Sequence, residues 1–183
     1  MGVILDAISG GDLVTIVKTN ISDAFDLTGK DLAAFFVEVK NRAAGKKISV
    51  LRIWGHGVTH YTDGTPYNKG SLEFGPDKLN NDTVGKFQPF LEVITPFFEQ
   101  PSSRVELRGC QAAVGTGANM MLALANIWKA EVQGSDRSQP MMSWVPPVYS
   151  AKPGSSPLPV RRGEVPLPLA TIIEYNDPRV KKP

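Results

Sequence analysis

Short hydrophobic runs that alternate with segments of helical periodicity constrain the fold of this chain more than any other feature. The run at 48–54 has the length and apolar character of a buried strand, and further strands are expected at 104–108 and 131–134. Helices of ten or more residues are expected between them. Strands separated by such helices form βαβ units with right-handed crossovers, so the sequence predicts an α/β protein with a mostly parallel sheet.

The N-terminal part is expected to hold one strand and one helix. Leu13–Val17 is a short β-branched run near two glycines, which predicts a first strand. Thr28 and Asp31 then resemble a capping box with Asp in place of Glu, and apolar residues follow at spacings of four, three and four. The predicted helix ends near Gly45.

Two more helices are expected in the centre of the chain. From Asp82 onward, apolar residues recur at intervals of three and four, but Pro89 and Pro96 interrupt the pattern and are expected to kink or split the helix. The segment 117–128 is apolar almost all round, which predicts a helix packed on both sides.

The segment after the strand at 48–54 has a different composition. Residues 58–70 are rich in Gly, Asp, Asn, Thr and Pro, which predicts an irregular loop. Gly70–Gly75 alternates in polarity between glycines and is expected to form a small strand of a hairpin.

The C-terminal part is rich in proline. Ten of the fifteen prolines follow Arg137, a composition typical of an extended arm or linker. However, 148–151 and 169–175 are apolar enough to predict strands between those prolines. We therefore expect one domain over 1–183, with an α/β core at 1–137 and extended edge segments at 138–183 that could also bind a partner protein.

Composition argues against several function classes. The net charge of +2, with no basic patch interleaved with aromatic residues, does not indicate a nucleic-acid partner. No apolar run approaches the roughly 20 residues that span a bilayer, so no membrane association is expected. A single cysteine rules out an internal disulfide and fits a reducing compartment. Since the first residues do not resemble a cleavable signal peptide, we expect a cytoplasmic protein or, alternatively, an exported bacterial effector.

A histidine and the single cysteine each follow a predicted strand. The strand at 48–54 is followed by Gly55-His56-Gly57, and the strand at 104–108 by Gly109-Cys110. Because the carboxyl ends of parallel strands meet at one edge of a sheet, both side chains are expected there. An imidazole that accepts the thiol proton makes the thiolate a nucleophile for carbonyl carbon. The pattern therefore predicts a cysteine hydrolase.

These residues resemble the caspase-like clan of cysteine peptidases, whose histidine lies about 50 residues before the cysteine. Gly70–Gly75 and Leu107–Ala113 are similar to stretches of the caspase-like domains of large bacterial surface proteins and of self-cleaving cysteine protease domains in bacterial toxins. Pro147–Ala151 resembles the strand that follows in those domains. The likeness covers roughly 48–151. Animal caspases have Gln-Ala-Cys-Arg-Gly where this chain has Arg108-Gly109-Cys110-Gln111-Ala112, so aspartate-specific cleavage is not implied.

The resemblance implies a caspase-like three-layer α/β/α sandwich and an endopeptidase without a cofactor. In it, His56 is the general base and then the general acid, and Cys110 is the nucleophile. The N–H groups of Gly57 and Cys110 bind the oxyanion, where one donor typically contributes about 3 kcal/mol. Since Cys110 precedes a helix, the helix dipole favours its thiolate. The implied substrate is a partner protein, a peptide or the chain itself.

Two residues are candidates for the pocket that receives the residue before the scissile bond. The resemblance places Arg108 at this pocket, and strand alternation puts Arg108 on the same face as Cys110. Its guanidinium would select an acidic side chain. Asp136, just after the next predicted strand, would neutralise Arg108 or select a basic side chain. Alternatively, Arg108 simply pairs with a neighbouring carboxylate at the surface.

Other interpretations remain open. His60 is an alternative general base, although it lies within the expected loop. A zinc site built from His56, His60, Asp63 and Cys110 is disfavoured, because the two histidines are not on a helix and lack the Glu of a zincin. No metal is therefore expected. The chain can also be a catalytically silent caspase-like interaction module.

Overall fold

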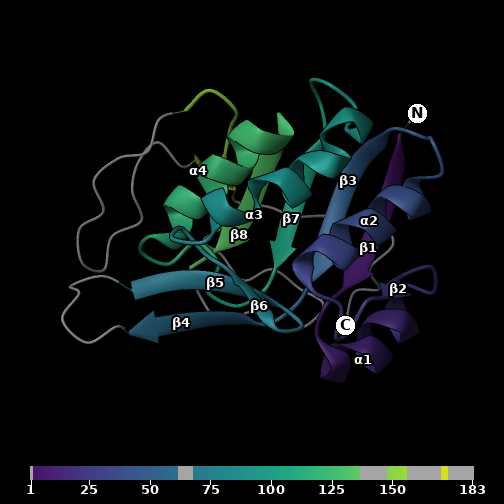
Figure 1. Cartoon of the computed structure of the whole chain (residues 1–183), viewed down its shortest axis with the longest axis horizontal. Coiled ribbons are helices and arrows are strands. Elements are labelled where there is room, and N and C mark those ends of the chain that lie inside the picture. Colours follow the sequence, from purple (N-terminus) through teal and green to yellow (C-terminus); the bar gives the residue numbers. More distant parts are fainter. Residues whose placement is uncertain (1, 62–67, 137–147, 156–169, 173–183) are drawn as a thin grey trace.

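The computed structural model describes residues 2–61, 68–136, 148–155 and 170–172, and in these ranges the chain is an α/β protein (Figure 1). The main sheet has seven strands in the order β10-β9-β8-β7-β3-β1-β2. β1 pairs in parallel with β2 and β3, and β7 pairs in parallel with β3 and β8. β9 and β10 are added in antiparallel fashion at one side. The strands span β1 Val3–Ile8, β2 Phe25–Asp26, β3 Ile48–Trp54, β7 Arg104–Arg108, β8 Glu131–Ser135, β9 Val148–Ala151 and β10 Ala170–Ile172. The predicted mostly parallel sheet is confirmed.

A second, antiparallel sheet follows β3 directly. It contains β4 Gly57–Tyr61, β5 Asn68–Phe74 and β6 Asp77–Leu79, with β5 in the middle. The predicted strand at Gly70–Gly75 is confirmed as part of β5. The predicted irregular loop at 58–70 is wrong at its two ends, because β4 and β5 pair across it; residues 62–67 lie outside the described part. The glycine and polar residues of 58–70 show no apolar alternation. The sequence pattern therefore did not indicate the pairing of β4 with β5, which depends on main-chain hydrogen bonds.

The predicted helices are present, but the predicted capping box is wrong. The N-cap of α2 (Leu32–Ala43) is Asp31 and not Thr28, and the Asp31 carboxylate accepts a hydrogen bond from the Ala34 N–H at 2.7 Å. The helix at 84–97 is split into α3 (Val84–Leu91) and a 3₁₀ helix (Glu92–Phe97), as its two prolines predicted. α4 spans Gly117–Trp128.

The predicted strand near the N-terminus is wrong. Leu13–Val17 is not a strand, because Gly11–Leu13 forms a 3₁₀ helix and α1 spans Val14–Asn20. Leu13 and Val17 are buried and four residues apart, so they pack on Ile8 and Trp54 and override the β propensity of the run. The first strand is β1, which the sequence pattern did not show because a charged residue, Asp6, interrupts it.

The two faces of the main sheet differ in polarity. One face carries the large hydrophobic core, where Ala7, Leu51, Ile53, Val105 and Leu107 pack with buried side chains of α2, α3 and α4. Figure 1 shows these helices in front of the sheet. On the opposite face, the cluster around α1 covers the ends of β1 and β3. Asp6, Arg52, Glu106 and Arg108 are also buried on that face, which matters for the site below.

None of the described helices is both long enough and apolar enough to cross a membrane.

Candidate active site at the carboxyl edge of the sheet

The carboxyl ends of β1, β3, β7 and β8 lie side by side at one edge of the main sheet. β3 and β7 are direct neighbours, and their register pairs Trp54 with Arg108. His56 and Cys110 each lie two residues beyond these paired positions. The structure therefore places the two predicted residues after adjacent parallel strands, at the same edge of the sheet.

Main-chain packing holds the two strand extensions together. A Cβ built on Gly57 would overlap the carbonyl oxygen of Cys110 and would lie 2.9 Å from the Cys110 nitrogen. A Cβ built on Gly109 would lie 3.0 Å from the Gly57 nitrogen. Side chains at either position would separate the strand extensions, so glycine is what permits this approach. The residue after the candidate base thus touches the candidate nucleophile.

The segment after Cys110 crosses beneath the β4–β5 hairpin. The Gly70 N–H donates to the Val114 carbonyl at 3.0 Å, and a Cβ on Gly70 would lie 2.6 Å from the carbonyl oxygen of Ala112. On the other side, the Ala113 N–H donates to the carbonyl of Ser135, at the end of β8, at 2.9 Å. The segment 110–117 is therefore fixed to both β5 and β8. Cys110 itself is partly buried.

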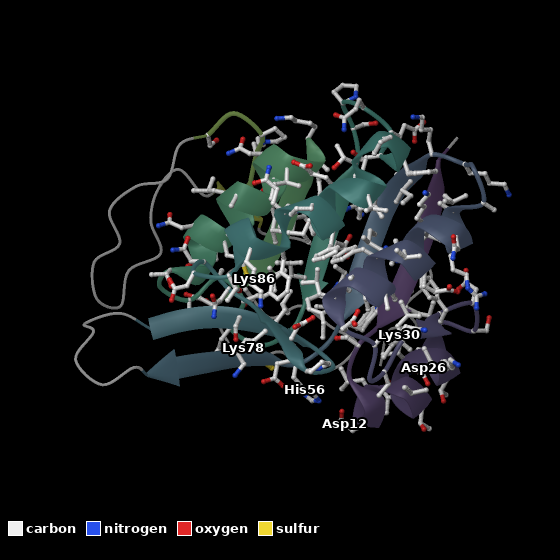
Figure 2. The ribbon with its side chains drawn as sticks, viewed as in Figure 1. Asp12, Asp26, Lys30, His56, Lys78 and Lys86 are labelled. Atoms are coloured by element: carbon white, nitrogen blue, oxygen red, sulfur yellow. The ribbon has the colours of Figure 1, made fainter. Side chains whose placement is uncertain are left out.

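His56 has a carboxylate partner that the sequence analysis missed. Its Nε2 lies 2.6 Å from Oδ1 of Asp12, which belongs to the 3₁₀ helix after β1. Figure 2 shows the two side chains next to each other at the edge of the molecule. Because an ionised carboxylate can only accept a hydrogen bond, this contact puts the imidazole proton on Nε2 and leaves Nδ1 as the acceptor.

The contact also shifts the ionisation of Asp12. The hydrogen bond from His56 holds the pKa of Asp12 below its usual value of 3.8, with His56 charge acting in the same direction and desolvation opposing it. Both side chains remain open to solvent, with exposed fractions of 48% for His56 and 67% for Asp12. Recognising Val3–Ile8 as a strand would have pointed to Asp12, because Asp12 then follows a strand end as His56 and Cys110 do.

Arg108 lies on the polar face of the sheet and is buried. Its guanidinium contacts Glu106 twice, through Nε at 3.0 Å and Nη2 at 2.8 Å. It also lies over the Trp54 ring, 5.2 Å from the ring centroid. A carboxylate partner was one of the sequence-based alternatives. However, the prediction that such a pair lies at the surface is wrong, because the side chains of Arg108 and Glu106 are 2% and 0% exposed.

This pair belongs to a closed ring of contacts across β1, β3 and β7. Glu106 Oε2 also accepts from Arg52 Nε at 2.9 Å, and Arg52 Nη1 lies 3.5 Å from Asp6. Asp6 in turn accepts from the Trp54 indole N–H at 2.9 Å. Burial alone would raise the pKa of Glu106, but the positive charges of Arg108, Arg52 and Arg104 outweigh it and lower this pKa. The ring keeps ionised groups inside by pairing them.

Asp136 follows β8 and has a different partner. Its Oδ2 accepts from the Tyr149 hydroxyl at 3.2 Å, and its buried Oδ1 has no hydrogen-bond partner among the described residues. The carboxylate shown in contact with Arg108 is that of Glu106.

The alternative base and the disfavoured metal site fall largely outside the described residues. The main chain of His60 lies in β4, but its side chain and the whole of Asp63 are not in the described part. Among the described residues, no three His, Cys, Asp or Glu side chains are grouped so that they could hold a metal ion.

Comparisons of the chain with protein-family models, with curated proteins and with solved structures found no match.

Proposed function

We propose that this chain is a caspase-like cysteine endopeptidase that cleaves a protein substrate or its own chain. The observation that carries the proposal is the contact of Gly57 with the main chain of Cys110, which holds the residues after two adjacent parallel strands together. A base and a nucleophile on rigid neighbouring elements are what covalent catalysis requires. The resemblance of the motifs at 70–75 and 107–113 to bacterial caspase-like domains supports the same reaction.

In this mechanism His56 moves protons while Cys110 forms and breaks bonds. Nδ1 of His56 accepts the thiol proton, and the Cys110 thiolate attacks the scissile carbonyl carbon. The N–H groups of Gly57 and Cys110 donate to the oxyanion of the tetrahedral intermediate. The C–N bond then breaks, and the imidazolium gives its proton to the leaving amine. Water, deprotonated by His56, hydrolyses the thioester and restores the free thiol.

Asp12 acts through His56 as a positioning residue. Its carboxylate fixes the ring orientation and the tautomer, and it stabilises the imidazolium that forms during attack. The contact distance of 2.6 Å and the lowered pKa of Asp12 support this role. The catalytic unit that we propose is therefore Asp12, His56 and Cys110.

We also propose that the pocket for the residue before the scissile bond prefers a neutral side chain. If Arg108 lines this pocket, its charge is already paired with Glu106, which lies on the same strand. A paired guanidinium attracts an acidic side chain less than a free one does. Asp136, engaged by Tyr149, remains the alternative residue that would select a basic side chain.

Peptide cleavage tests the proposal directly. The purified protein is incubated with a peptide library, and products are identified by mass spectrometry. We expect cleavage by the wild type and none by Cys110→Ala, with the same circular dichroism spectrum for both. His56→Ala should lose a comparable amount of activity, because residues that act as a unit are not additive, whereas His60→Ala should lose little. Cleavage by the Cys110→Ala variant would refute the assignment.

Thiol alkylation separates a peptidase from a silent interaction module of the same fold. Iodoacetamide should modify Cys110 rapidly at neutral pH in the wild type and slowly in His56→Ala, because only a base-activated thiol is a good nucleophile. Equal and slow modification of both proteins would favour the interaction module.

A further inference from the structure

We propose that the outer edge of β4 binds the main chain of the substrate as an extended strand that runs antiparallel to β4. This inference rests on the proposed peptidase function, since it states where the peptide lies while Cys110 attacks it. Among the described residues, β4 is an edge strand of the small sheet, whose order is β4-β5-β6. Edge strands direct main-chain N–H and C=O groups away from the sheet, and an extended peptide can pair with them.

The hydrogen bonds of β5 show which residues of β4 direct their polar groups outward. The Glu73 N–H donates to the His56 carbonyl at 3.2 Å, so these two residues form a hydrogen-bonded pair across the hairpin. In an antiparallel pair, hydrogen-bonded and non-hydrogen-bonded positions alternate. His56, Val58 and His60 therefore face β5, whereas Gly57, Thr59 and Tyr61 face outward.

A second hydrogen bond confirms this alternation. Gly70, which the register places opposite Thr59, donates its N–H to Val114 and not to β4. The Thr59–Gly70 pair is thus a non-hydrogen-bonded pair, and the Thr59 N–H and C=O point to the outer side of the hairpin. Figure 1 shows β4 and β5 side by side.

The main chain of the candidate nucleophile lies against one face of the first residue of this strand. Cys110 packs against Gly57, the first residue of β4, and the chain then passes beneath β5 at Gly70. The Gly57 N–H, which the mechanism uses for the oxyanion, is the first of the outward N–H groups. A carbonyl bound there is consequently in line with the outward groups of Thr59 and Tyr61.

This alignment fixes the register of the bound peptide. The residue that supplies the scissile carbonyl pairs with Gly57. In antiparallel pairing, the residue two positions before it pairs with Thr59, and the residue four positions before it pairs with Tyr61. The residue one position before the scissile one directs its N–H and C=O away from β4. The β4 edge therefore recognises the main-chain groups of every second substrate residue on the N-terminal side of the cleaved bond.

Backbone-modified peptides test this register with the wild-type protein. The peptide that a library screen shows to be cleaved fastest is resynthesised with a single N-methyl group, either one or two residues before the scissile residue. A second pair of peptides carries an ester in place of the amide at the same two positions, which removes the N–H donor without adding a methyl group. We expect kcat/KM to fall by about tenfold when the modified residue lies two positions before the scissile residue. We expect little change when it lies one position before the scissile residue.

The outcomes distinguish this inference from the proposed function. Equal losses of kcat/KM for both modified positions, or a loss only for the position one residue before the scissile residue, would overturn the pairing with β4. Either result would leave the proposed peptidase function in place. Failure of the wild type to cleave any peptide, together with slow alkylation of Cys110, would overturn the peptidase and this inference with it.

Discussion

Gly57 and Cys110 are in direct main-chain contact although 53 positions separate them, and a methyl group on Gly57 would overlap the Cys110 carbonyl oxygen. The glycine after the candidate base is thus required by the position of the candidate nucleophile. A side chain at position 57 would displace the loop that carries Cys110 or the start of β4. Either displacement would change the geometry of nucleophilic attack by Cys110.

Gly57→Ala should therefore abolish peptide cleavage and slow the alkylation of Cys110 by iodoacetamide. The matched control is Gly85→Ala in α3, where an added Cβ meets no atom within 4 Å. Because alanine favours a helix by about 0.5–1 kcal/mol over glycine, this control should be slightly more stable than the wild type and equally active. Full activity of Gly57→Ala would show that the contact is not needed.

Asp12→Asn should lower kcat for peptide cleavage by at least about tenfold with little change in KM, because the amide orients the imidazole less well and does not stabilise the imidazolium. Asp26→Asn is the control. It removes the same charge, but Asp26 bonds only to the nearby turn, where its Oδ1 accepts from the Thr28 N–H at 2.9 Å. Equal losses in both variants would assign the effect to net charge and not to the contact with His56.

The ionisation of Asp12 offers a test that is independent of activity. In the wild type, an NMR titration of the side-chain carboxyl should give a pKa below 3.8, and His56→Ala should raise it towards 3.8. The pKa of Asp26, which hydrogen bonds from Thr28 lower, should be the same in both proteins. Because the folded-state pKa of Asp12 is lowered, the His56–Asp12 contact stabilises the fold above about pH 3.8, and this contribution is lost as the pH falls through the lowered value. An Asp12 pKa that does not respond to His56→Ala would contradict the contact.

The sequence predicted the elements whose side chains decide their packing. The strand at 48–54 and the helix at 117–128 are mostly apolar, the strand at 104–108 alternates charged residues with buried Val105 and Leu107, and the bounds of all three agree with the structure. Two of the errors, at β1 and at α1, arise from contacts with residues that are distant in the sequence. In β1, buried Asp6 breaks the apolar pattern because its partners Arg52 and Trp54 come from another strand. In α1, tertiary packing overrides the preference of a β-branched run.

The same limits apply to the candidate site. His56 and Cys110 could be found because each directly follows a predicted strand, and parallel strands end at one edge. Asp12 could not be found, since the strand before it was not recognised. The partner of Arg108 was open between several carboxylates, because the sequence does not show which residues of the neighbouring strands share a carboxylate with it. Here Glu106 has enough lone pairs to accept from Arg108, Arg52 and Arg104 together.

Glu106→Gln should destabilise the protein by about 3–5 kcal/mol, because it leaves the buried charges of Arg52 and Arg108 without their shared counter-ion. Urea unfolding followed by tryptophan fluorescence measures the loss. Glu38→Gln provides a control with the same chemical change, since the exposed Glu38–Arg42 pair contributes about 0.5 kcal/mol or less. Since the pKa of Glu106 is lowered from 4.5, its contribution is present above that pH and is lost as the pH falls through the lowered value. Equal stability of both variants would show that the ring does not hold the sheet together.

The cleavage profile of the wild type should show a preference for a neutral residue before the scissile bond. The reason is that the Arg108 guanidinium is bonded to Glu106 at 2.8 Å and stacked on Trp54, so it offers little net charge to a substrate side chain. Asp136→Asn should leave this profile unchanged, because the Asp136 carboxylate is engaged by Tyr149. A preference for acidic residues would instead mean that Arg108 acts on the substrate despite its partner. A preference for Arg or Lys that disappears in Asp136→Asn would assign the pocket to Asp136.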